Sequence, residues 1–197
     1  MTAAGVVLLG ILTASASPTA QLERLDSIAE DLFDQARAAD WTRADKTFDR
    51  LRAECARQAA PACTGTDGAH ALNTMDTALK ARQSQQAMQG ANDFSLLLVP
   101  AIDQAAGNTG VAALDPAVRQ LMIDVHDSAA VKRDLDALSA MTDKLRCDPK
   151  PVRRFRKRVG DAERAASSGE VAARLLEALD QGVDQLEATC LPTSADR

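Results

Sequence analysis

The sequence predicts an all-α protein, an up-and-down antiparallel helical bundle, with two similar helical halves as a further hypothesis. Three observations lead to this fold class. Apolar residues make up 46% of the 197 residues and recur at gaps of three and four along most of the chain. Only 10 Gly and 7 Pro are present, too few for a turn-rich sandwich or barrel. Alanine is abundant and β-branched residues are sparse, which favours helix over strand.

Residues 1–20 predict a secretory signal peptide. Their apolar run, within residues 5–16, is about a dozen residues long, whereas a bilayer span needs about 20. The small residues Ala14-Ser15-Ala16 form a candidate cleavage site, and cleavage after Ala20 is a second option. The mature chain is therefore expected in the periplasm or outside the cell, without a transmembrane segment.

The first helical half is expected over residues 21–110 and begins with two capped helices. Ser17-Pro18 places a cap residue before a proline at the first helical position. Asp40 can cap the second helix. The two apolar faces comprise, in order, Leu22, Leu25, Ile28 or Ala29, Leu32 and Ala36, then Trp41, Ala44, Phe48, Leu51 and Cys55.

A loop is predicted over residues 61–68, followed by one long helix. This helix starts near Asp67, crosses a polar stretch at 82–89 and is bent or restarted at Pro100. The sequence FSLLLV at 94–99 is apolar nearly all round, so we expect it to lie centrally.

The second half is expected over residues 111–192, with a disordered tail at 193–197. Asp115-Pro116 predicts a second cap-and-proline start, and Asp127-Ser128 and Ser167–Glu170 predict turns. Pro149 and Pro151 are expected to end one helix. The apolar faces comprise Val118, Leu121, Met122 and Val125; Val131, Leu135, Leu138, Met141 and Leu145; Val152, Phe155, Val159 and Ala162; and Leu175 or Leu176, Leu179, Val183, Leu186 and Cys190.

The two halves are similar enough to suggest an internal repeat. Leu25-Asp26 and Leu114-Asp115 are each expected to open a helix of similar length. At a shift of 90 residues, Trp41, Phe48, Leu51 and Cys55 align with Val131, Leu138, Met141 and Leu145. A duplication explains this agreement, and the alternative is that any two faces with a three-four period can be aligned.

Four cysteines in an exported chain predict two disulfide bonds. We expect Cys55–Cys63, which are eight residues apart, and Cys147–Cys190, which a helical hairpin turning at Ser167–Glu170 brings together. The alternative is one unbroken helix over 150–189, about 60 Å long, with Cys190 bonded to Cys63. No pair has the C-x-x-C spacing, so a zinc ribbon, a redox pair and covalent haem attachment have no support.

The stretch from Ala91-Asn92 through Leu114-Asp115, Arg119 and Asp127 to Leu145 resembles a group of uncharacterised exported all-helical bacterial proteins. The resemblance covers about a quarter of the chain and implies an exported bundle of unknown role; it brings no catalytic residues with it. The helix lengths of the second half are similar in architecture to small four-helix haem-b cytochromes. The axial ligand positions of those cytochromes are not matched in this sequence.

Catalytic and metal-binding motifs are absent from the sequence. The two histidines, His70 and His126, fit neither H-x-x-x-H nor H-E-x-x-H nor E-x-x-H, so no zinc or di-iron centre is predicted. No G-x-S-x-G or glycine-rich phosphate loop occurs, and the protein is not expected to be an enzyme. Haem ligation by a histidine and one of Met75, Met88, Met122 or Met141 is possible in principle, although methionines on apolar faces usually fill cores.

The segment 150–158 places six basic residues in an acidic protein of net charge −5. As a helix it carries Lys150, Arg153, Arg154 and Lys157 on one side, which makes these four the candidate anion-binding residues. One interpretation is neutralisation from within the protein, by Asp124, Asp127, Asp134, Asp136 and Asp143. The other is an external anion: an anionic lipid headgroup, an envelope polyanion or an acidic partner protein. Nucleic acid is not expected for an exported acidic protein.

The sequence therefore predicts a non-catalytic binding or structural protein of the cell envelope, with an unknown protein or an anionic envelope component as its partner. No cofactor is expected. The alternative is a metal- or haem-binding bundle of the electron-carrier type.

Overall fold

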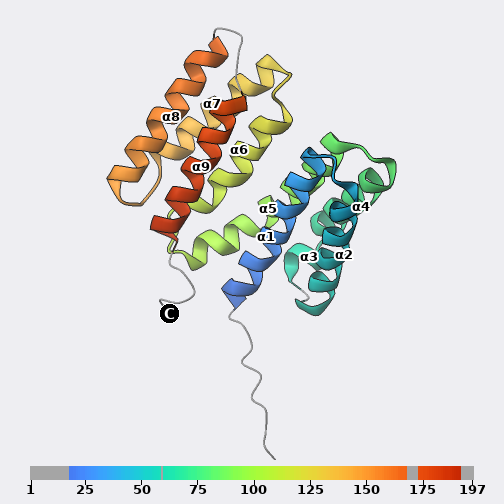
Figure 1. Ribbon diagram of the computed structural model, residues 1–197. Helices are drawn as coiled ribbons and strands as arrows, with labels where there is room; N and C mark the ends of the chain where they lie inside the picture. Colours follow the sequence, from blue (N-terminus) through green and yellow to red (C-terminus); the bar gives the residue numbers. More distant parts are fainter. Residues whose placement is uncertain (1–17, 59, 168–172, 192–197) are drawn as a thin grey trace, which may run out of the picture.

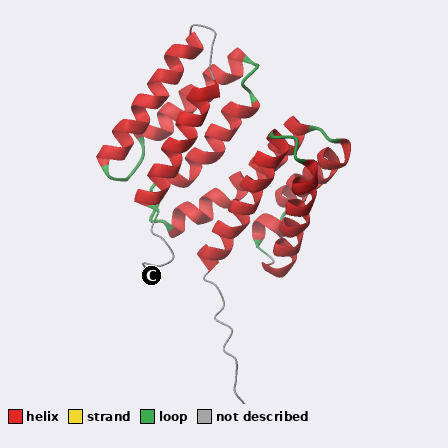
Figure 2. Ribbon diagram, viewed as in Figure 1, coloured by secondary structure: helices red, strands yellow, loops and turns green. Residues whose placement is uncertain are grey.

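The structure is a computed structural model that describes residues 18–58, 60–167 and 173–191. Over these residues it is helical and contains no strand, as Figure 2 shows, so the all-α prediction is confirmed. The helices are α1 (Pro18–Arg37), α2 (Trp41–Gln58), α3 (Pro61–Thr64), α4 (Thr66–Ala81), α5 (Ser84–Ala105), α6 (Leu114–Ile123), α7 (Ser128–Asp143), α8 (Pro149–Ser167) and α9 (Ala173–Cys190), with a 3-10 turn, η1 (Val111–Ala113), before α6.

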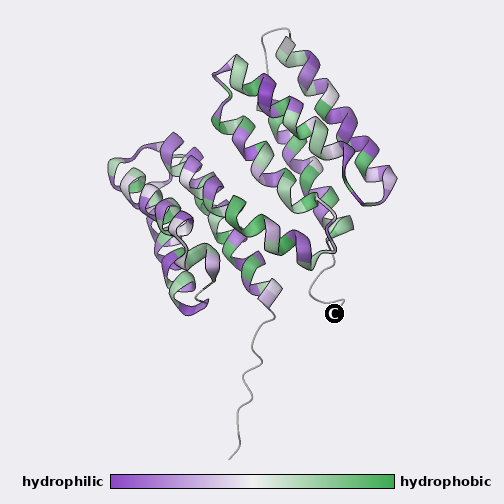
Figure 3. Ribbon diagram, turned by 180° about the vertical axis from the view of Figure 1, so that it is seen from behind, coloured by the Kyte–Doolittle hydropathy of each residue, from purple (hydrophilic) through white to green (hydrophobic). Residues whose placement is uncertain are grey.

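The helices form two packed groups joined through α5 and α6 (Figure 1). In the first group α5 packs against α1 and α4, and α2 covers α1. In the second group α6, α7, α8 and α9 pack in sequence, and α9 returns to contact α6 and η1. Figure 3 shows apolar residues along α5. Phe94 and Leu98 are buried, as expected for 94–99, but Leu96 is 46% exposed, so this stretch is not covered on all sides.

The second helix follows its predicted cap, and both of the first two helices follow their predicted apolar faces; the predicted cap of α1, Ser17, lies outside the described residues. The backbone N–H of Arg43 donates to Asp40 Oδ1 at 3.2 Å, which confirms Asp40 as the cap of α2. The predicted faces are buried except at their margins, where Leu22 and Trp41 are partly exposed.

The predicted loop and long helix after α2 are wrong in two respects. Residues 61–64 form a one-turn helix, α3, because Pro61 is suited to the first helical position. The long helix is broken between α4 and α5, where Arg82 adopts a left-handed conformation with φ 55°. The Arg82 guanidinium forks onto Asp45 at 2.8 and 2.9 Å and stacks over the Trp41 ring, so contacts with α2 fix the break. Pro100 lies inside α5 instead of restarting a helix.

The start of α6 also differs from its prediction. Asp115 lies inside the first turn and binds Arg119 instead of capping the helix. The helix is 10 residues long, against 20 for α1, and α1 starts at Pro18 instead of Leu25. The expected pair of similar opening helices is therefore wrong, while the internal repeat itself stays a prediction.

In α7 one residue that the sequence predicts to be buried lies on the exposed side of the helix. Asp127 caps this helix, since its Oδ1 accepts from the N–H groups of Ala129 and Ala130 at 3.0 and 3.1 Å. Met141, predicted to be buried, is 36% exposed, and Thr142 is buried in its place. The Thr142 hydroxyl donates to the Leu138 carbonyl at 2.8 Å, so its burial leaves no polar group unpaired.

Both predicted disulfides are confirmed. Cys55 and Cys63 are joined across α2 and α3, with Cα atoms 5.3 Å apart. Cys147 and Cys190 are joined across the ends of α8 and α9, with Cα atoms 5.7 Å apart. The alternative Cys63–Cys190 pairing and the unbroken helix over 150–189 are therefore excluded.

Three sequence predictions lie outside the described residues in whole or in part. Residues 1–17 of the predicted signal peptide lie outside the described residues, while residues 18–20 are the first residues of α1. Cleavage after Ala16 leaves α1 whole, whereas cleavage after Ala20 removes its first three residues. The predicted turn at Ser167–Glu170 and the tail at 193–197 lie outside as well, apart from Ser167, the last residue of α8.

Candidate functional site

The predicted basic segment forms the first half of α8 and presents one charged side to solvent. Val152, Phe155 and Val159 face inward, and Phe155 is only 1% exposed. On the other side, residues i, i+3, i+4 and i+7 share one helix surface and all are exposed. We call this set the basic face: Lys150, Arg153, Arg154 and Lys157.

Of the five acids expected to neutralise the segment from within, Asp143 pairs with one of its bases, Arg156, and none pairs with the basic face. Asp143 pairs with Arg156 at 2.9 Å, Asp136 pairs with Lys132 at 2.9 Å, and Asp127 caps α7. Within the residues that the structure describes, the basic face makes no ion pair. Its charges also lie at the N-terminal end of α8, where the helix dipole disfavours cations. An anion from outside would therefore stabilise this face.

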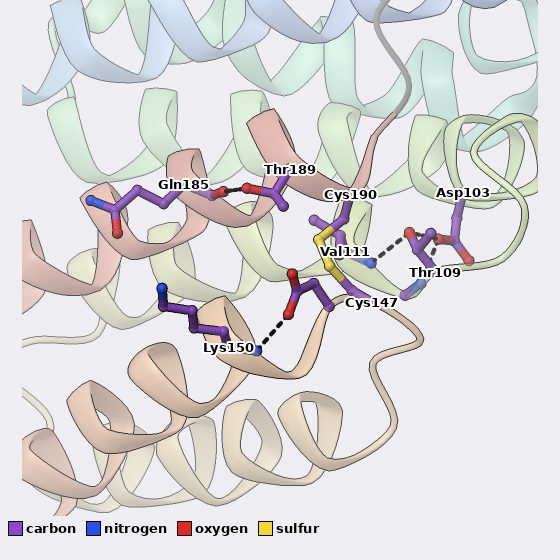
Figure 4. The surroundings of a disulfide bond; sticks show 10 residues. Asp103, Thr109, Val111, Cys147, Lys150, Gln185, Thr189 and Cys190 are labelled. Carbon is purple, nitrogen blue, oxygen red and sulfur yellow. Dashed lines mark hydrogen bonds between the residues drawn. A yellow bond between two sulfur atoms is a disulfide. The ribbon is translucent and has the colours of Figure 1, made fainter.

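The helix that carries the basic face is fixed at both ends of its charged half, and Figure 4 shows the N-terminal end. Asp148 caps α8, because its Oδ1 accepts from the backbone N–H of Lys150 at 2.8 Å. The disulfide of Cys147 ties this corner to the end of α9. Farther along, Arg158 Nη1 donates to the Ala178 carbonyl of α9 at 2.8 Å. The four side chains are thus displayed by a backbone held in place on the second group of helices.

A buried charged cluster, which the sequence analysis missed, lies where the two groups of helices meet. Its centre is Arg119 of α6, only 2% exposed. The guanidinium binds Asp115, donates to the Ser95 hydroxyl at 3.1 Å and lies 3.6 Å from Glu30 of α1. It also lies over the Phe33 ring, 5.8 Å from its centroid. One arginine therefore bridges α1, α5 and α6.

The carboxylates around Arg119 outnumber it, and burial holds them toward the neutral form. Burial raises the pKa of Asp26 despite the opposing effects of Arg119 and Ser95. Burial likewise raises the pKa of Asp115 to about 7, although Arg119 opposes the shift. The pKa of Glu187, on α9, is raised to about 8 by burial and by the neighbouring acids, Asp115 first among them. The cluster can hold protons near neutral pH.

One sequence signal could have revealed this cluster. Asp115 and Arg119 are four residues apart, and Leu114, Val118 and Leu121 are buried around them on the same short helix. An i,i+4 ion pair set among core residues predicts a buried pair with further partners.

The histidines and methionines are dispersed. His70 and His126 are both exposed, on α4 and before α7 respectively. Met75 is fully buried, while Met122 Sδ accepts from Arg37 Nη1 at 3.1 Å. Over the described ranges no group of three or more His, Cys, Asp or Glu residues is arranged to hold a metal ion.

Comparison with known proteins assigns no family to this architecture: no protein-family model, curated protein or solved structure matches the chain. None of the helices in 18–58, 60–167 and 173–191 is long and apolar enough to cross a bilayer.

Proposed function

We propose that the protein is an exported, non-catalytic binding protein of the cell envelope, which docks onto an anionic envelope component through the basic face of α8. The observation that carries the proposal is the exposure of four basic side chains without a carboxylate partner among the described residues. Because the whole chain has a net charge of −5, the attraction is local to this face.

Export is supported by the cysteines and by the N-terminal sequence. Both cysteine pairs are bonded, and such bonds persist in oxidising compartments such as the periplasm and the extracellular space. The apolar run before Ala14-Ser15-Ala16 fits a secretory signal. The two together support a periplasmic or secreted location.

The expected strength can be worked out from the number of charges. Each basic residue near an anionic bilayer contributes about 1 kcal/mol, so the face contributes roughly 4 kcal/mol, or about a thousandfold in partitioning. The effect depends on salt, since the Debye length falls from about 10 Å at 0.1 M to about 3 Å at 1 M.

The test is cosedimentation of the chain that begins at Ser17, without the predicted signal peptide, with vesicles rich in phosphatidylglycerol, alongside phosphatidylcholine vesicles and a soluble polyanion. We expect binding to the anionic vesicles at low salt, its loss at high salt and no binding to the neutral vesicles. Changing Lys150, Arg153, Arg154 and Lys157 together to Gln is expected to abolish binding without loss of stability.

A matched control changes four basic residues that already have carboxylate partners: Arg43, Arg50, Lys80 and Lys132. This variant has the same net charge as the first, so it should retain most of the binding if the basic face is responsible. Equal losses in both variants, or no binding by the unmodified protein to either anionic probe at low salt, would contradict the proposal.

A further inference from the structure

A groove of about 210 Å3 lies between α5, α6 and α7, none of which carries the basic face. Its apolar walls come from all three helices and from η1: Leu96, Ala113, Pro116, Ala117, Ala137 and Met141. Leu96 and Met141 are 46% and 36% exposed, and they are the large apolar side chains most open to solvent in the described residues. Both line this one groove. Exposed apolar side chains that lie together in a folded protein mark binding surfaces.

One residue of the groove wall, Asn92, carries a buried acceptor without a donor in the described part of the chain. Asn92 is fully buried, and its Nδ2 donates to the Pro116 carbonyl and to Gln120 Oε1, both at 3.1 Å. Since a proline carbonyl can only accept, the amide cannot be turned round. Asn92 Oδ1 therefore has no donor among the described residues. A buried acceptor left in this state costs about 1–3 kcal/mol, which a bound donor would recover.

A second acceptor lies in the same groove, and it is charged. Asp134 Oδ2 is buried, and Oδ1 lies 3.9 Å from Arg133 Nε. The side-chain partner of this carboxyl group is a second acid, Asp124, so the two acids can share one proton, and no basic or amide group of the described residues donates to Oδ2. Burial raises the pKa of Asp134 to about 6, and the neighbouring Asp124 adds to the shift. Two carboxylates side by side in this position are complementary to a cation.

The remaining polar side chain of the groove offers no spare donor. Gln120 Nε2 already donates to Asp124 Oδ2 at 2.8 Å and to Gln89 Oε1 at 3.3 Å. The groove thus combines apolar walls with two acceptors, one of them a carboxylate. Its occupant needs an apolar body and a donor with a positive charge.

We propose that this groove binds a small alkylammonium compound, with the ammonium group at Asp134 and Asn92 and the chain between Leu96 and Met141. Its volume of about 210 Å3 limits the occupant to a small molecule. The site is separate from the anion-docking face, because it lies on other helices and selects the opposite charge.

The test is a titration of the 15N-labelled full chain with hexylamine, followed by amide chemical shifts. We expect saturable shifts at residues around 92, 96, 113–120 and 134–141. Hexanol, which keeps the chain but loses the charge, should bind at least about tenfold more weakly. Hexanoate should not bind, and trimethylhexylammonium, which has no N–H donor, should bind more weakly than hexylamine.

Three variants separate the site from general effects. Asp134→Asn removes the charge, and Ala137→Met fills the groove from an exposed position, so both should reduce hexylamine affinity at least about tenfold with unchanged circular dichroism. Asp136→Asn is the matched control, because Asp136 is exposed and pairs with Lys132 outside the groove.

The proposal is overturned if no saturable shift appears at millimolar hexylamine, or if hexanol or hexanoate binds as well as hexylamine. An equal loss of affinity in Asp136→Asn would also overturn it. Nα-acetyl-lysine amide keeps its charged ε-ammonium group. If it bound more tightly than hexylamine, the assignment to a small alkylammonium compound would be overturned in favour of a lysine side chain.

Discussion

Arg119 shows how much of this structure depends on one charged side chain. Its guanidinium is almost fully buried, and its contacts with Asp115, Ser95 and Glu30 cross the boundary between the two groups of helices. Desolvating such a charge is costly, so it is tolerated only where its partners remain in place. Removing the arginine would leave buried carboxylates without their counter-ion.

We therefore predict that Arg119→Met lowers the free energy of unfolding by about 3–5 kcal/mol. The double variant Arg119→Met/Asp115→Asn removes both charges of the closest pair and should be more stable than the single variant by at least about 1 kcal/mol. Urea denaturation measures both values. A loss below about 1 kcal/mol for Arg119→Met, or a double variant no better than the single one, would show that the cluster is not coupled in this way.

At the scale of helices, α8 and α9 approach closely at Gly182. A Cβ atom there would lie 2.7 Å from Phe155 Cδ2 and 2.8 Å from Arg158 Nη1. Glycine therefore allows α9 to lie against the Phe155 ring. This contact and the Cys147–Cys190 disulfide together hold the helix that carries the basic face.

We predict that Gly182→Ala destabilises the protein by about 1–3 kcal/mol, because the aromatic ring has to move. Gly160→Ala on α8 is the control, since the nearest atom to its added Cβ is the end of Arg164, 3.6 Å away. That substitution should stabilise the protein by about 0.5–1 kcal/mol through helix propensity. Thermal unfolding followed by circular dichroism compares the two, and equal effects would refute the close packing at Gly182.

The whole molecule joins two groups of helices across a region rich in acids. Asp26 and Glu30 on α1, Asp115 on α6, and Asp180 and Glu187 on α9 all have a raised pKa, with burial as the largest cause. A carboxyl group with a raised pKa in the folded state binds its proton more tightly there than in the unfolded chain. Its stabilising contribution is therefore present at acidic pH and is lost as the pH rises through the folded pKa.

The protein is thus expected to be more stable at pH 5.5 than at pH 8.5, since Asp115 and Glu187, with pKa values of about 7 and 8, lose their protons in this interval. A difference of about 1 kcal/mol corresponds to roughly 2–4 °C in Tm for a chain of this size.

Glu187→Gln should raise the Tm at pH 8.5 and reduce the difference in Tm between pH 5.5 and pH 8.5. Glu177→Gln, an exposed change on the same helix, should leave it unaltered. A Tm that rises from pH 5.5 to pH 8.5 would contradict the expectation.

Local patterns account for the parts of the fold that the sequence predicted well. Asp40 caps its helix because capping involves only residues two or three positions away. The disulfides follow from helix ends that are close in the chain or brought together by a hairpin. The sequence also located the basic face, because helical periodicity alone places its four residues on one side.

Other features depend on which helices become neighbours, so they are determined only when the helices pack. Arg82 ends α4 because Asp45 and Trp41 of α2 lie within reach of its side chain. Met141 is exposed and Thr142 is buried because a three-residue and a four-residue step are equally helical, so only the position of the neighbouring helices selects between them. Arg119 is buried because α1 and α5 close over α6. Short-range periodicity can be identified from the sequence alone, whereas contacts between residues far apart in the chain form only when the helices pack.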